Sequence, residues 1–268
     1  LIPLRGEWTF LTKNSGAQGL NGCCGYKGFS RDNWGDTRKI QVPGCWEAQD
    51  VGEPGMGVPW DQIYDENSKP IRHKYIGEAW YKKEVGIPAS WAGKRVWLKI
   101  GGVKSQGFFF VNDRQVALVY NYCGTYKYDI TAFVEPGKTA KIVVQVRNDI
   151  PSRKGLFSAM NRWGGLYRDV ELEATPQVRI DDAWVRGDFD RGEAEAHVTV
   201  GGGTGKVRVT VEGQSAEVDV VPNGETVVRL PIKDFRAWSP EQPNLYWANI
   251  TLLDKDGAVL HSRRERFG

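Results

Sequence analysis

Histidine and cysteine are scarce in this chain, and their positions argue against metal and disulfide chemistry. The three histidines, at positions 73, 197 and 261, show no metal-ligand spacing. The four cysteines, at positions 23, 24, 45 and 123, are too few and too irregularly spaced for a disulfide scaffold. We therefore expect no metal site and no cofactor. The cysteines leave the cellular compartment open, and we favour a periplasmic or secreted location over a cytoplasmic one.

Long apolar runs and strongly charged segments are also missing. No apolar stretch approaches the ~20 residues that a membrane span requires. The net charge is +3: residues 178–268 carry 12 Lys and Arg against 15 Asp and Glu, which leaves 24 against 18 in the preceding part. The basic excess of that part forms no cluster or stripe of the kind that binds nucleic acid. We therefore expect neither a membrane nor a nucleic acid as partner.

Helical periodicity is almost absent, and apolar residues instead recur at every second position. Residues 95–100 and 141–147 each place their apolar side chains on one face, as strands do. Residues 108–111 are continuously apolar, which predicts a strand buried on both faces. Further strands are predicted at 78–87, 107–111, 126–130 and 166–172. An all-β protein with less than about a tenth of its residues in helices follows from this pattern.

The length of 268 residues fits two domains, which we place at 1–175 and 176–268. In the second domain, alternation begins at residues 193–200, where Ala194 and Val198 point one way and Glu195 and His197 the other. We therefore expect His197 to face solvent. Further strands are predicted at 206–211, 216–221, 226–230, 247–253 and 259–266. Seven short strands in about ninety residues are typical of an immunoglobulin-like sandwich.

Residues 48–77 form a long exception to the strand pattern, with several Gly and Pro residues and almost no periodicity. A loop of this length inside a compact domain is usually functional or disordered. Its large apolar residues, among them Trp60 and Tyr64, argue against disorder. We expect an ordered loop that packs against another part of the protein.

An ordered series of motifs gives the chain a resemblance to a known family. Residues 237–246, Ala-Trp-Ser-Pro-Glu-Gln-Pro-Asn-Leu-Tyr, resemble the W-S-P-E-x-P-x-L-Y signature of family 2 glycoside hydrolases, the β-galactosidases, β-glucuronidases and β-mannosidases. Weaker motifs of the same family occur in order at residues 6–10, 42–46, 80–98, 111–113, 129–131, 144–148 and 164–172. The resemblance covers essentially the whole chain. It implies a jelly-roll, galactose-binding-like β-sandwich followed by an immunoglobulin-like β-sandwich.

The same resemblance implies that this chain holds no catalytic residue. In the family both catalytic carboxylates lie on a (β/α)8 barrel, and Phe267-Gly268 resembles the start of the connector into that barrel. We therefore expect a non-catalytic N-terminal fragment of a retaining β-glycosidase, inactive alone, with the C-terminal barrel as its partner. The acidic residues that cluster in this chain are expected to remain ordinary solvated carboxylates: Asp61, Asp65, Glu66, Asp181 and Asp182.

Two segments are candidates for sugar contact, because in the family loops of the first sandwich reach the barrel mouth. In the first, Asp61, Tyr64 and Asp65 supply acceptors and an aromatic ring, the groups that sugar hydroxyls and C–H faces bind. The alternative is a loop held by its own hydrogen bonds.

The second segment contributes Asn161, Arg162 and Trp163. In β-galactosidases this stretch carries an Asp that contacts the sugar, and residues 158–162 contain no carboxylate. Arg162 could pair with an acidic sugar, but an interdomain salt bridge is favoured. For Arg168 we expect an ion pair with Asp129 or Asp149.

A carbohydrate is thus the expected ligand, bound through the full-length enzyme. The alternative function is a stand-alone carbohydrate-binding module that acts like a lectin. A protein-interaction sandwich without a sugar role is a third, weaker hypothesis. Whether a barrel is encoded in frame after Gly268 separates the first hypothesis from the other two.

Overall fold

The computed structural model describes residues 1–12, 34, 37–54, 73–75, 77–120, 124–148 and 163–268. The chain divides into two compact units, Leu1–Ala174 and Thr175–Gly268. The predicted all-β architecture is confirmed. Helical structure within the described ranges consists of three short 3-10 segments: η1 (Glu47–Gln49), η3 (Ala89–Trp91) and η4 (Thr131–Phe133).

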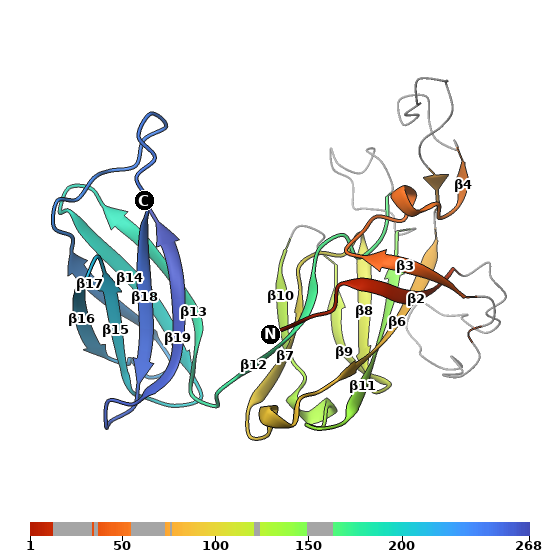
Figure 1. Cartoon of the computed structure of the whole chain (residues 1–268), viewed down its shortest axis with the longest axis horizontal. Coiled ribbons are helices and arrows are strands. Elements are labelled where there is room, and N and C mark those ends of the chain that lie inside the picture. The colour runs from red at the N-terminus through yellow and green to blue at the C-terminus, as the bar shows by residue number, and fades with distance from the viewer. Residues whose placement is uncertain (13–33, 35–36, 55–72, 76, 121–123, 149–162) are drawn as a thin grey trace. The chain divides into compact units, whose positions relative to one another are not determined.

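The first unit is a jelly-roll sandwich of two antiparallel sheets (Figure 1). Its four-stranded sheet has the order β1-β12-β7-β10, with β1 at Ile2–Pro3, β12 at Val170–Thr175, β7 at Arg95–Ile100 and β10 at Tyr126–Asp129. Its six-stranded sheet has the order β3-β2-β6-β11-β8-β9, with β3 at Arg38–Val42, β2 at Gly6–Thr12, β6 at Glu78–Gly86, β11 at Thr139–Arg147, β8 at Gln106–Val111 and β9 at Arg114–Val119. A separate ribbon pairs β4 (Glu53–Pro54) with β5 (His73–Lys74).

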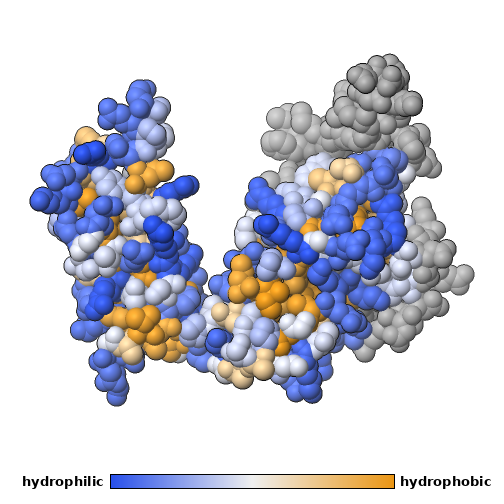
Figure 2. Space-filling model, viewed as in Figure 1, coloured by the Kyte–Doolittle hydropathy of each residue, from blue (hydrophilic) through white to orange (hydrophobic). Residues whose placement is uncertain are grey.

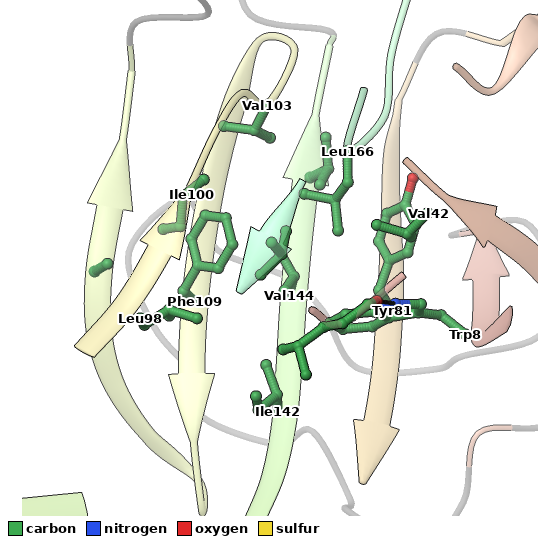
Figure 3. Close-up of a cluster of buried hydrophobic side chains, with 14 of the residues drawn as sticks. Trp8, Val42, Tyr81, Leu98, Ile100, Val103, Phe109, Ile142, Val144 and Leu166 are labelled. Carbon is green, nitrogen blue, oxygen red and sulfur yellow. Dashed lines mark hydrogen bonds between the residues drawn. The ribbon is translucent and has the colours of Figure 1, made fainter. Parts of the chain in front are cut away.

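The core of the first unit lies between its two sheets (Figure 3). Leu98 and Ile100 of β7 face Phe109 of β8 across this core, and all three are fully buried. The rings of Trp8 and Tyr81 pack edge to face with their centroids 6.3 Å apart. The period-two alternation of the sequence therefore sets which side chains enter the core.

Strand β8 is buried on both faces, as its continuous apolar run predicts. Phe109 belongs to the main core, whereas Phe110 points to the opposite side of the six-stranded sheet. There it stacks on Trp80 at 6.3 Å, in a second cluster with Leu11, Val143 and Trp34. Strands β11 and β9 flank β8, so both of its edges are also paired.

The second unit is an immunoglobulin-like sandwich of seven antiparallel strands (Figure 1). The order β13-β14-β17 forms one sheet, with β13 at Arg179–Asp188, β14 at Glu193–Gly201 and β17 at Glu225–Pro231. The order β16-β15-β18-β19 forms the other, with β16 at Gln214–Asp219, β15 at Lys206–Val211, β18 at Tyr246–Leu253 and β19 at Val259–Phe267. Val198, Val209 and Ile250 are fully buried between the two sheets.

Two strand positions differ from the sequence prediction. The strand predicted at residues 166–172 begins only at Val170: Gly165 forms an isolated bridge with Lys104, the Leu166 carbonyl accepts from the Gly44 N–H, and residue 168 is a bend. The strand predicted at 216–221 lies at Gln214–Asp219. Glu212 and Gly213 both have positive φ, which gives the tight two-residue turn that pairs Val211 with Gln214.

Two expectations about single side chains are also corrected. Asp129 pairs with Arg95 and not with Arg168, whose guanidinium carbon lies 5.6 Å from the Tyr167 ring centroid. Asp149 lies outside the described residues. His197 is on the outer face of β14 as expected, but its side chain is only 12% exposed, since the indole of Trp184 stacks on it at 3.7 Å.

The surface of each unit is mainly hydrophilic on the face shown in Figure 2, with smaller hydrophobic areas. Among the described residues, no helix is long and apolar enough to cross a membrane. The same residues contain no group of three or more His, Cys, Asp or Glu side chains placed to hold a metal ion.

Candidate functional site at one edge of the first sandwich

Of the six residues that the sequence nominates for sugar contact, the structure describes one. Asp61, Tyr64, Asp65, Asn161 and Arg162 lie outside the described residues, and Trp163 lies within them. We therefore describe the site through the residues near the ends of segments 55–72 and 149–162. We call Trp46, Glu47, Tyr75, Asn148 and Gly164 the loop-end cluster.

Asn148 ties the end of β11 to the start of β6. The residue is buried, and its side-chain oxygen accepts a hydrogen bond from the Gly77 N–H at 2.8 Å. Its side-chain nitrogen donates to the Tyr75 carbonyl at 2.7 Å, and its backbone N–H donates to the Gly77 carbonyl at 3.1 Å. The residues that follow segment 55–72 are thus fixed to the residue that precedes segment 149–162.

Gly164 ties the far end of segment 149–162 to Trp46. The Trp46 N–H donates to the Gly164 carbonyl at 2.9 Å, and the Gly44 N–H donates to the Leu166 carbonyl at 2.8 Å. A Cβ on Gly164 would lie 2.1 Å from the Trp46 ring, so only glycine allows this approach. Ends of both segments therefore meet around one buried tryptophan.

Trp46 is the centre of the loop-end cluster. Its side chain is fully buried, and its indole N–H donates to the Tyr81 hydroxyl at 2.5 Å. The Tyr75 ring packs edge to face against it with the centroids 5.4 Å apart. Burial raises the pKa of Tyr81 well above its usual range, so this hydroxyl stays neutral and can both accept and donate.

Glu47 is a buried carboxylate in the loop-end cluster that the sequence reasoning missed. It follows Trp46 in η1, is 5% exposed, and accepts a hydrogen bond from the Gly164 N–H at 3.3 Å. The sequence could have indicated Glu47, because an acidic residue directly follows the V-P-G-x-W motif where the long loop begins. Its bond to Gly164 gives this carboxylate a role in holding the turn.

Trp163 lies at the rim of the loop-end cluster and is partly exposed. Its ring packs edge to face against Tyr167 with the centroids 4.8 Å apart, and the Lys104 ammonium lies 5.6 Å from its centroid. Lys104 is held in place because its backbone N–H and carbonyl both bond to Gly165, at 3.0 and 3.2 Å. An aromatic face next to an ammonium can pack on the C–H face of a sugar and attract a hydroxyl or carboxylate.

His73 and Asp50 add a polar contact beside the ribbon formed by β4 and β5. His73 Nδ1 lies 3.1 Å from Asp50 Oδ1, and Asp50 follows η1 in the left-handed conformation, with a φ of 57°. Because His73 comes directly after segment 55–72, this contact joins that segment to the turn that carries Glu47. The edge thus combines a fixed apolar centre with a polar rim.

Two antiparallel sandwiches follow one another along the chain, and the motif-bearing Trp46 and Gly164 are in contact at one edge of the first sandwich. Residues 2–176 match the family profile described as glycosyl hydrolases family 2, sugar binding domain. Residues 178–268 match a second profile, described as glycosyl hydrolases family 2. The chain belongs to glycosyl hydrolase family 2.

Curated relatives include a β-glucuronidase from Bacteroides fragilis, 27% identical over 90% of this chain and 36% of the relative. A β-galactosidase from Streptococcus thermophilus is 27% identical over 84% of this chain and 23% of the relative. This chain therefore spans well under half the length of these relatives.

Among solved structures, the β-glucuronidase from Ruminococcus gnavus in complex with D-glucuronic acid superposes with a TM-score of 0.72 at 21% identity. The match covers 99% of this chain and 45% of that structure. At this level of identity the likeness establishes the fold.

Proposed function

We propose that this chain is the non-catalytic N-terminal region of a retaining β-glycosidase, and that its first sandwich edges the active site of a barrel in the longer protein. The observation that carries the proposal is the meeting of the two segment ends on Trp46. The relatives whose names state an activity are glycosidases, and this chain corresponds to only part of their length.

The loop-end cluster supplies the rigidity that such an edge needs. Loops that contact a ligand are most effective when a rigid scaffold fixes their ends. Segment 149–162 is flanked by Asn148 and Gly164, and buried hydrogen bonds fix both of these residues. Tyr75, which follows segment 55–72, accepts one of these bonds from Asn148. We place Asp61, Tyr64, Asp65, Asn161 and Arg162 with Trp163 at this edge, as sugar-contacting residues of the full-length enzyme.

The proposed substrate class is a β-glycoside, with glucuronides ahead of galactosides. Residues 158–162 lack a carboxylate, and the ammonium of Lys104 lies beside Trp163. A cationic rim attracts a uronic acid more than a neutral sugar. Aryl β-glucuronides, β-galactosides and β-mannosides, tested on the longer open reading frame that includes this chain, would rank the three classes. Fastest hydrolysis of a β-galactoside would contradict the proposed order.

Sugar binding by the isolated chain tests the arrangement without the barrel. Only part of the pocket is present, so few contacts offset the cost of association. Calorimetric titration with glucuronate or galactose should therefore show millimolar affinity or none. Micromolar binding that Tyr64→Ala or Asn161→Ala abolishes would instead support a lectin-like module.

A further inference from the structure

The outer face of the sheet β16-β15-β18-β19 carries an exposed tryptophan beside two arginines. Strands β18 and β19 are neighbours in this sheet (Figure 1). Trp247 of β18 pairs across the strands with Arg266 of β19, and Asn249 pairs with Arg264. The Trp247 side chain is 42% exposed. The guanidinium carbon of Arg264 lies 4.2 Å from the Trp247 ring centroid, and that of Arg266 lies 5.8 Å from it. We call Trp247, Arg264 and Arg266 the β18–β19 patch.

Neither arginine of the β18–β19 patch has a carboxylate partner within Thr175–Gly268, all of which the structure describes. Their neighbours are paired: Arg263 contacts Glu265 at 3.0 Å, and Arg208 on the same outer face pairs with Glu217. The patch therefore presents two guanidinium groups whose donors face solvent and the indole.

The outer face of the opposite sheet also carries a tryptophan and two arginines, but there the charge of the arginines is neutralised. There the exposed Trp184 stacks on His197, and Arg186 and Arg229 both bond to Glu195, at 2.7 and 2.8 Å. Hydrogen bonds from His197 and from the two arginines hold the pKa of Glu195 at about 2, so this carboxylate is charged at neutral pH. The arginines on the opposite face are thus neutralised by a carboxylate, whereas those of the β18–β19 patch are not.

We propose that the β18–β19 patch binds an acidic polysaccharide, with the indole packed on a sugar ring and the two guanidinium groups on its carboxylates. A guanidinium binds a carboxylate through two parallel hydrogen bonds. Arg264 and Arg266 are two residues apart on one strand, which spaces them by about 7 Å along the chain direction. One extended anionic chain can therefore engage both.

The surroundings of the β18–β19 patch favour a carbohydrate over a protein partner. Asn249, Thr251 and Ser262 lie on the same outer face, with Thr251 paired to Ser262. These amide and hydroxyl groups suit sugar hydroxyls, whereas a stable protein interface needs an apolar centre of several large side chains. This site belongs to the second unit and does not depend on the glycosidase proposed above.

Affinity electrophoresis of the 268-residue chain tests the proposal, with alginate, a polyuronate, as the acidic probe and dextran as the neutral one. Alginate should retard the native chain in a salt-sensitive manner, and dextran should not. The double variant Arg264→Gln/Arg266→Gln and the variant Trp247→Ala should each weaken alginate binding at least tenfold. The control is Arg208→Gln, compared with Arg264→Gln and Arg266→Gln singly: it removes one arginine charge from the same face at an already paired position and should change binding less than twofold.

Thermal unfolding of each variant is the check on the fold, which should be kept because both arginines are exposed and outside the core. No retardation by alginate would overturn the proposal, as would an equal loss in Arg208→Gln or equal binding of dextran. Self-association that Trp247→Ala abolishes would show that the face binds a second copy of the chain instead.

Discussion

At the scale of single residues, the loop-end cluster depends on side chains that allow close approach. Gly164 lets the backbone of one segment end lie against the Trp46 ring, and the Asn148 side chain satisfies backbone groups of Tyr75 and Gly77, between β5 and β6. These residues have no alternative of similar size and chemistry. The cluster should therefore be sensitive to small substitutions.

Gly164→Ala should destabilise the first unit by about 1–3 kcal/mol, because the new methyl group must displace a buried indole. The control is Gly86→Ala, where a Cβ meets nothing within 4 Å, and its effect should stay within about 0.5 kcal/mol. Urea unfolding followed by tryptophan fluorescence measures both. Equal midpoints for the two variants would show that the contact with Trp46 does not constrain the fold.

Glu195 should make the second unit sensitive to acid. Hydrogen bonding from His197 and then from Arg186 and Arg229 lowers its pKa from 4.5 to about 2. A carboxyl group with a depressed pKa stabilises the fold above its unfolded pKa, and that contribution is lost as the pH falls from about 4.5 towards 2. Glu195→Gln should therefore lower stability at pH 7 and flatten the loss of stability as the pH falls from about 4.5 towards 2.

Urea midpoints of the second unit at several pH values check this expectation. Glu241→Gln, at an exposed position, is the matched charge control and should follow the unmodified chain. A Glu195→Gln variant as acid-sensitive as the unmodified chain would mean that another group causes the acid response.

At the scale of elements, Asn148 connects β11 with the start of β6. Asn148→Ala removes the acceptor for the Gly77 N–H and the donor to the Tyr75 carbonyl, which should cost about 1–3 kcal/mol. Hydrogen exchange at Gly77 should quicken in this variant. Asn249→Ala, an exposed truncation in the second unit, should leave Gly77 unchanged. Unchanged protection of Gly77 in Asn148→Ala would refute this role.

The strand pattern was the most predictable part of the structure. Strands β7 and β11 match their predicted ranges closely because alternation reflects the two faces of a sheet. The start of β16 was misplaced because the sequence does not show that Glu212 adopts a positive φ. The start of β12 was misplaced because the sequence does not show that Leu166 bonds to Gly44 instead of continuing a ladder.

The candidate site was less predictable, because it depends on contacts between residues far apart in the sequence. Glu47 and Gly164 are separated by 117 positions, and no local pattern indicates that one binds the other. Of the two partners expected for Arg168, Asp129 was wrong for the same reason: Asp129 pairs with Arg95 because β7 and β10 are neighbours in the sheet. The other, Asp149, lies outside the described residues. Trp163 was nominated because it ends the stretch before the Gly164 motif, and its contact with sugar stays a prediction.

At the scale of the whole molecule, the chain combines two sandwiches that match the two family 2 profiles in order. Retaining hydrolysis needs two carboxyl groups about 5–5.5 Å apart in a preorganised pocket. The buried carboxylate of the loop-end cluster, Glu47, is engaged by Gly164, so it serves the turn. Under the function proposed above, catalysis belongs to a barrel outside these 268 residues.

Far-ultraviolet circular dichroism should show an all-β spectrum, with helix below about a tenth of the residues. The strands of both sandwiches and the three short 3-10 segments give this expectation. A substantial helical minimum near 222 nm, at roughly the level of an average globular protein, would contradict it.

Glycosidase assays test the central claim most directly. The purified 268-residue chain and the product of the longer open reading frame would be assayed side by side on aryl β-glucuronides, β-galactosides and β-mannosides. The account predicts no turnover by the chain alone and hydrolysis with retained anomeric configuration by the longer product. Turnover that copurifies with the chain alone and disappears in Asp61→Asn or Asp65→Asn would contradict it.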